Sequence, residues 1–109
     1  MINSKEQMFT EKLRSLLKFG PNSTRFKDIF DMCYLSDLMN RDKLMTCLDI
    51  FVFSDPGMRE NNMHDICRRV NNTFDSSQYV FRLSSSRKNW LNIEISDALK
   101  KLSSFLETL

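Results

Sequence analysis

The chain has 109 residues, of which 41% are hydrophobic and 28% charged, a composition typical of one globular domain and not of a disordered segment. No stretch approaches the roughly 20 apolar residues of a membrane span, and the charged N-terminus lacks the apolar core of a signal peptide. The formal net charge of +2 permits a nucleic-acid partner without requiring one, because the basic residues are interspersed with 14 acidic ones.

Apolar residues recur at helical spacing along most of the chain. Gly20-Pro21 is expected to end the first helix, and a cap at Ser23 or Thr24 to begin the second, which would reach about Met39. Ser54 to Gly57 form a strong turn signal. The predicted helices cover, in chain order, residues 4–19, about 24–39, 41–53 with Asn40 as cap, about 61–74, and a last helix capped by Ser96 that carries Leu99, Leu102, Leu106 and Leu109.

Residues 78–95 and the apolar run 50–53 are ambiguous between helix and strand. Tyr79, Phe81 and Leu83 alternate with other residues, and so do Leu91 to Ile95, which also suits short strands. We favour helix or irregular structure because isolated short strands need partners and the rest of the chain is helical. The predicted fold is therefore all-α, a compact bundle of about five to six short helices in a single domain, residues 1–109.

Cysteines and glycines narrow the class of protein further. The three cysteines cannot all pair within the chain, and none stands in a Cys-x-x-Cys spacing, so we expect reduced thiols and a cytoplasmic location. Gly20 and Gly57 are the only glycines, whereas phosphate-binding loops, dinucleotide-binding turns and nucleophile elbows need several closely spaced ones. The sequence therefore excludes these common enzyme motifs.

Lys12 breaks the pattern of the first predicted helix. At 100° per residue it falls between Met8 and Leu16, inside the apolar stripe. A buried ammonium group without a partner is costly, so the side chain must reach solvent, meet a carboxylate or face an anion. A lysine whose stem packs while its head reaches water is one interpretation, and a lysine aimed at a phosphate is the other.

Two acidic residues stand near the start of the second predicted helix. Asp28 and Asp31 are spaced i,i+3, which places them on one side of that helix. The helix dipole favours carboxylates there, and Lys27 with Asp31 forms an ordinary i,i+4 pair. These structural explanations stand beside a catalytic one, in which the carboxylates serve acid–base chemistry.

These segments resemble the second half of the AbiEii/AbiGii family, the nucleotidyltransferase toxins of abortive-infection toxin–antitoxin systems. The resemblance rests on Glu11-Lys12-Leu13 and, after a glycine, on the Arg-x-Lys-Asp-x-x-Asp pattern from Arg25 to Asp31. Residues 58–62 and 89–91 also look like the C-terminal helical part of such proteins. The likeness covers most of this chain but only the trailing part of a full-length member.

The resemblance implies roles for five residues. Lys12 would match the family lysine that contacts nucleotide phosphates, and Asp28 the later active-site aspartate. Arg25, Lys27 and Asp31 would be supporting positions. A full-length relative would use Mg²⁺ and a nucleoside triphosphate, act on tRNA or another acceptor, and be opposed by a cognate antitoxin.

One departure from the family pattern limits this expectation. Family members carry, upstream, a Gly-Ser turn and a pair of metal-binding acids two residues apart, which two-metal nucleotidyl transfer requires. This sequence has no Gly-Ser, and no two of its acidic residues are separated by a single residue. We therefore expect no metal ligands or cofactor in this chain, which would be a fragment or truncated homologue that is inactive alone.

A rival hypothesis assigns the chain to a different class, a helical protein-interaction module without nucleotide chemistry, acting as a homodimer or with another protein. Binding of RNA by short basic pairs such as Arg87-Lys88 is a third hypothesis. It predicts an affinity that falls steeply with salt.

Overall fold

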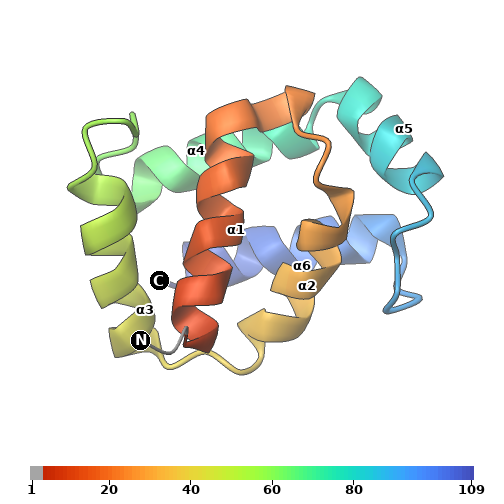
Figure 1. The fold of residues 1–109 in the computed structure, drawn as a ribbon. Helices are drawn as coiled ribbons and strands as arrows, with labels where there is room; N and C mark the ends of the chain where they lie inside the picture. Colours follow the sequence, from red (N-terminus) through yellow and green to blue (C-terminus); the bar gives the residue numbers. More distant parts are fainter. Residues whose placement is uncertain (1–3) are drawn as a thin grey trace.

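A computed structural model describes residues 4–109, which fold into an all-α bundle and contain no strand in that range (Figure 1). None of the helices within these residues combines the length and the apolar character needed to cross a membrane. A 3₁₀ turn, η1 (Gly20–Asn22), follows the first helix, and a π-helical turn, η2 (Asp49–Phe53), extends the third. The helices are α1 (Lys5–Phe19), α2 (Phe26–Ser36), α3 (Arg41–Leu48), α4 (Met63–Phe74), α5 (Ser77–Ser85) and α6 (Ile95–Glu107).

α1 occupies the middle of the bundle. In Figure 1 it stands between α3 and α2, while α4 and α6 cross behind it, and the contacts place α1 directly against α2, α3 and α4. Its inner face is made by Phe9 and Leu13, both fully buried. Phe9 meets Phe105 of α6 edge to face, with ring centroids 5.5 Å apart. The central position of α1 explains why a polar residue on its inner side needs a partner.

Several predicted helix ends are confirmed. The Ser4 hydroxyl accepts a hydrogen bond from the Gln7 amide at 3.0 Å and caps α1. Gly20 ends that helix with a φ of 54°, a conformation that other L-residues adopt only at a cost. The Asn40 side chain caps α3 by accepting from the Lys43 amide. The predicted turn at residues 54–57 is also present. The Asp55 carboxylate stabilises it by accepting a hydrogen bond from the Gly57 amide at 2.7 Å.

Two predicted helix caps are wrong. α2 begins at Phe26 after Arg25, and no side chain caps it; the Ser23 hydroxyl instead accepts from the Arg25 amide at 3.4 Å. α6 begins at Ile95, so Ser96 is already inside the helix. In both cases the chain enters the helix within a turn of the predicted residue, because packing of the following apolar residues sets the start more strongly than a single hydroxyl does.

The extent of α2 also differs from the prediction. The helix ends at Ser36 and not near Met39, so Leu38 lies beyond its end and is 42% exposed. Tyr34 is also exposed. Met32 and Leu35 are buried, because α2 contacts both α1 and α6 and its buried face is therefore wide.

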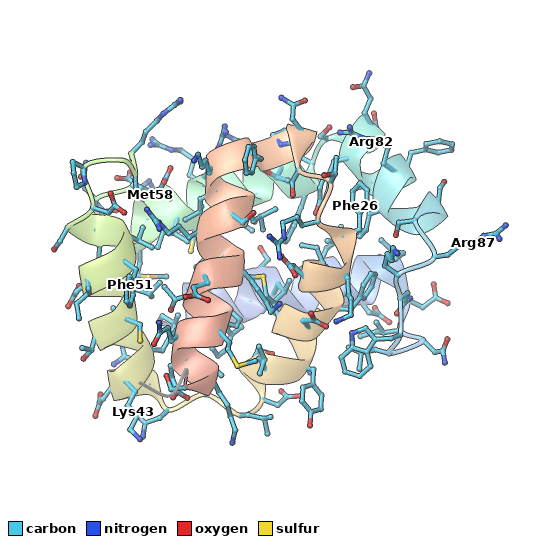
Figure 2. All side chains as sticks on the ribbon, viewed as in Figure 1. Phe26, Lys43, Phe51, Met58, Arg82 and Arg87 are labelled. Atoms are coloured by element: carbon cyan, nitrogen blue, oxygen red, sulfur yellow. The ribbon has the colours of Figure 1, made fainter. Side chains whose placement is uncertain are left out.

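The ambiguous segments contain no strand. Residues 77–85 form α5, and the apolar run 50–53 lies in η2, in agreement with the favoured interpretation. Tyr79 of α5 is fully buried and stacks on Phe74. Residues 86–94 are irregular and lead from α5 to α6, with Arg87 projecting away from the bundle (Figure 2).

Candidate functional site

The candidate site lies where α1 faces α2. The Lys12 Nζ is 3.1 Å from Oδ1 of Asp28 and 3.2 Å from Oδ2 of Asp31. The lysine side chain is 21% exposed, and the two carboxylate side chains are 11% and 12% exposed. A lysine in the apolar stripe could reach solvent, meet a carboxylate or face an anion. In the structure Lys12 meets two carboxylates.

Helix geometry explains why these three side chains meet. Asp28 lies in the first turn of α2 and Asp31 about one turn later, so both carboxylates leave the helix on the same side. Lys12 lies on the corresponding side of α1, between Met8 and Leu16. Because only a short connection joins the two helices, they pack side by side (Figure 1). This packing brings the lysine between the two carboxylates.

Two further cations surround the carboxylates. The Arg25 Nε is 2.8 Å from Oδ2 of Asp28, and the Lys27 Nζ is 2.9 Å from Oδ2 of Asp31, which confirms the predicted i,i+4 pair. Both cationic side chains are 64% exposed. Lys12, Arg25 and Lys27 thus face Asp28 and Asp31, and one positive charge remains in excess. We call these five residues the Lys12 cluster.

The ion pairs outweigh burial in setting the protonation of the cluster. Burial alone would lower the pKa of Lys12, but hydrogen bonds to Asp28 and Asp31 raise that pKa above its ordinary value of 10.5. Burial alone would raise the pKa of Asp31, but hydrogen bonds from Lys27, Lys12 and Trp90 hold it below 3.8. The lysine stays protonated and Asp31 stays ionised at neutral pH.

Trp90 is a member of the site that sequence reasoning did not place there. Its Nε1 donates a hydrogen bond to Oδ1 of Asp31 at 2.8 Å, and its ring lies 5.6 Å from that of Tyr34. In the sequence, Trp90 is a single aromatic residue two positions after the basic pair Arg87-Lys88. No spacing could reveal this contact, because it joins residues 59 positions apart.

An open pocket of about 210 Å³ lies beside the cluster. Lys12, Arg25 and Asp28 line it together with Met8 and Glu11. Pockets that enclose whole drug-sized ligands measure about 300–1,000 Å³. The volume therefore suits a single small group, such as a phosphate, better than an entire nucleotide, and Lys12 and Arg25 offer it two positive charges beside the negative charges of Glu11 and Asp28.

The residues of the cluster do not fit a magnesium site. Mg²⁺ takes oxygen ligands in octahedral geometry and is usually bound through one or two carboxylates. Here the ammonium group of Lys12 stands between Asp28 and Asp31, in the position a cation would need. Within residues 4–109 no three His, Cys, Asp or Glu side chains lie close enough together to hold a metal ion.

No protein-family model matches this chain, and neither curated proteins nor solved structures give a significant match. The chemistry of the site therefore has to carry the functional interpretation. A protonated lysine and an arginine at an open pocket can bind an anionic group, and the adjoining Asp28 carboxylate can orient a hydroxyl or accept its proton.

Proposed function

We propose that the chain is the C-terminal helical part of an AbiEii-like nucleotidyltransferase toxin, where it contributes the phosphate-binding lysine and the later aspartate. The observation that carries the proposal is the convergence of Lys12 and Asp28, whose Nζ and Oδ1 atoms are 3.1 Å apart at one open pocket although the residues lie 16 positions apart in the sequence. A lysine and an aspartate that act on one substrate have to meet at such a surface.

The chemistry of nucleotidyl transfer assigns a task to each member of the site. The reaction needs positive charge near the triphosphate, which Lys12 and Arg25 would supply. It also needs a carboxylate that orients the acceptor hydroxyl or removes its proton, which would be Asp28. Lys27 and Asp31 support the arrangement, since Asp31 holds Lys12 from the other side and Lys27 pairs with Asp31.

The magnesium-binding half of the catalytic centre would come from a segment outside this sequence. In a full-length relative, Mg²⁺ would assist transfer from a nucleoside triphosphate to tRNA or another acceptor, and a cognate antitoxin would oppose it. Because the Lys12 cluster does not fit a magnesium ion, we expect no transfer by this chain alone.

Phosphate binding tests the proposal directly. Inorganic tripolyphosphate is titrated into the purified chain and followed by calorimetry. The wild type should bind, Lys12→Met should lose binding, and Lys18→Met, which removes an equal charge from an exposed position of the same helix, should retain it. Equal losses in the two variants, or no binding by the wild type, would contradict the assignment of Lys12.

A labelling assay tests the claim that the site is incomplete. The chain is incubated with radiolabelled nucleoside triphosphates, Mg²⁺ and tRNA, and the expected result is no transfer. Label transferred by the wild type and lost in Lys12→Met would show that this chain holds a complete catalytic centre.

One observation favours the second candidate, a helical interaction module. Phe81 of α5 is 71% exposed, more than any other large hydrophobic side chain in residues 4–109. If α5 mediates self-association, the chain should sediment as a dimer and Phe81→Ser should sediment as a monomer. A wild type that sediments as a monomer at all concentrations would argue against the homodimer.

A further inference from the structure

The segment between α5 and α6, residues 86–94, has a backbone conformation that is costly to maintain. Arg87 and Asn92 have φ angles of 57° and 53°, in the left-handed region that L-residues rarely adopt. The Asn89 side chain braces the segment, since its Nδ2 donates to the Ile93 carbonyl at 2.6 Å and its Oδ1 accepts from the Ile93 backbone amide at 3.3 Å. Such strain persists where surrounding contacts impose it, and it is often found at functional sites.

This segment holds Trp90 against the Lys12 cluster. The indole remains 48% exposed. The hydrophobic effect therefore stabilises its position much less than it would stabilise a tryptophan in the core. Its polar contact is specific, a hydrogen bond of 2.8 Å from Nε1 to Oδ1 of Asp31. Tyr34 meets the indole ring at a centroid distance of 5.6 Å and helps to fix its orientation.

Trp90 and Lys12 share the same acceptor group. Oδ1 of Asp31 accepts from Trp90, while Oδ2 accepts from Lys12 at 3.2 Å. Hydrogen bonds to a carboxylate are charge-assisted, and donors on one carboxylate draw on the same negative charge. If one donor binds the carboxylate more strongly, the hydrogen bond from the other donor therefore becomes weaker.

We propose that Trp90 is a positioning residue for Lys12, and that through Asp31 it couples binding of a phosphate group at the Lys12 pocket to the segment 86–94. This inference rests on the proposed function for the identity of the bound group. A phosphate that draws Lys12 away from Asp31 leaves more charge on that carboxylate and strengthens the bond from Trp90. By thermodynamic reciprocity, the bond from Trp90 makes Lys12 easier to withdraw and favours phosphate binding.

The coupling is measurable without any ligand, because Trp90 is the only tryptophan in the chain and gives a single indole N–H resonance in a ¹⁵N NMR spectrum. Lys12→Met removes one donor from Asp31, so the indole proton should move downfield and exchange more slowly with water. Lys18→Met on the same helix should leave it in place. Lys12→Arg, which keeps the charge but alters the donor geometry, provides a second variant should the methionine variant fail to fold.

The ligand arm uses tripolyphosphate with the wild type and Trp90→Phe, followed by calorimetry. Loss of the indole donor should weaken binding about fivefold, the lower end of typical coupling between sites. Tyr34→Leu, which removes the ring contact and keeps the donor, should change the affinity much less. In the wild type, tripolyphosphate should also move the indole resonance downfield.

An indole resonance that stays unmoved in both Lys12 variants would overturn the inference, and so would a wild type that binds tripolyphosphate together with a Trp90→Phe variant that binds it equally tightly. Failure of the proposed function has a different signature. The wild type would then bind no tripolyphosphate while Lys12→Met still moves the indole resonance, which would support the role of Trp90 in orienting Lys12.

Discussion

Replacing Lys12 by methionine is expected to lower the free energy of unfolding by about 2 kcal/mol. Methionine keeps most of the apolar stem, so the change isolates the ammonium group. Breaking a buried ion pair costs about 3–5 kcal/mol, while an exposed pair contributes about 0–1 kcal/mol. Lys12 lies between these limits, with a side chain 21% exposed against carboxylates that are 11% and 12% exposed.

The estimate falls below the buried limit because neither carboxylate is left alone. Asp28 keeps its ion pair with Arg25, and Asp31 keeps Lys27 and the hydrogen bond from Trp90. These remaining partners are largely exposed and are screened by solvent, so they compensate only in part. Loss of Lys12 therefore removes the one excess positive charge of the cluster and leaves each carboxylate, only 11% and 12% exposed, with a single cation at the surface.

Urea unfolding at pH 7, followed by circular dichroism, measures the change, and an unaltered denaturant slope confirms that the unfolding transition is comparable. Asp28→Asn completes a double-mutant cycle. In the wild type, Asp28→Asn should lower the free energy of unfolding by about 1 kcal/mol or more, because the pair with Lys12 is lost. In the Lys12→Met background the same substitution should lower it much less. Equal costs in both backgrounds, or a Lys12→Met variant within about 0.5 kcal/mol of the wild type, would refute the reasoning.

Three further predictions concern pH, the helix end and the core. Because folding lowers the pKa of Asp31 and raises that of Lys12, both groups should stabilise the fold fully between pH 3.8 and 10.5. Melting temperatures measured across pH should fall below pH 3.8, where Asp31 becomes protonated, and above pH 10.5, where Lys12 loses its proton. Gly20→Ala should lower the free energy of unfolding in urea by about 1–3 kcal/mol, because φ is 54° at this position and an added Cβ would lie 2.7 Å from Arg69 Nη2. A variant as stable as the wild type would show that the turn relaxes. Leu102→Ala, at a fully buried position, should cost about 2–5 kcal/mol, and a much smaller loss would mean that the core collapses around the gap.

The helices were predictable because their signals are local. Apolar spacing marked α1, α3 and α4, and Ser4, Gly20 and Asn40 act at the predicted ends. The caps at Ser23 and Ser96 were wrong, since a hydroxyl can bind the backbone in several ways and tertiary packing chooses among them. Boundaries that depend on packing could not be obtained from the sequence alone.

The site was predictable to the extent that it depends on helix periodicity. Lys12 stood out because it interrupts an apolar stripe, and the i,i+3 spacing placed Asp28 and Asp31 on one side of the next helix. That these groups bind one another required the packing of α1 on α2. Trp90 reaches Asp31 from a strained irregular segment, and no periodic signal describes such a segment.

The π-helical turn η2 makes this part of the chain tolerant of the deletion of one residue. The Ser54 amide donates to the Asp49 carbonyl at 3.0 Å, so the turn holds one residue more than a regular α-helical turn. Loss of one residue from 49–53 would convert this wide turn to a regular α-helical turn, and the chain beyond it would keep nearly the same direction. Insertion of one residue into the regular turns of α3 would instead rotate the chain beyond it by about 100°, so that Asp55, which pairs with Arg14 of α1, would face another direction and the loop that leads to α4 would lose its tether to the centre of the bundle.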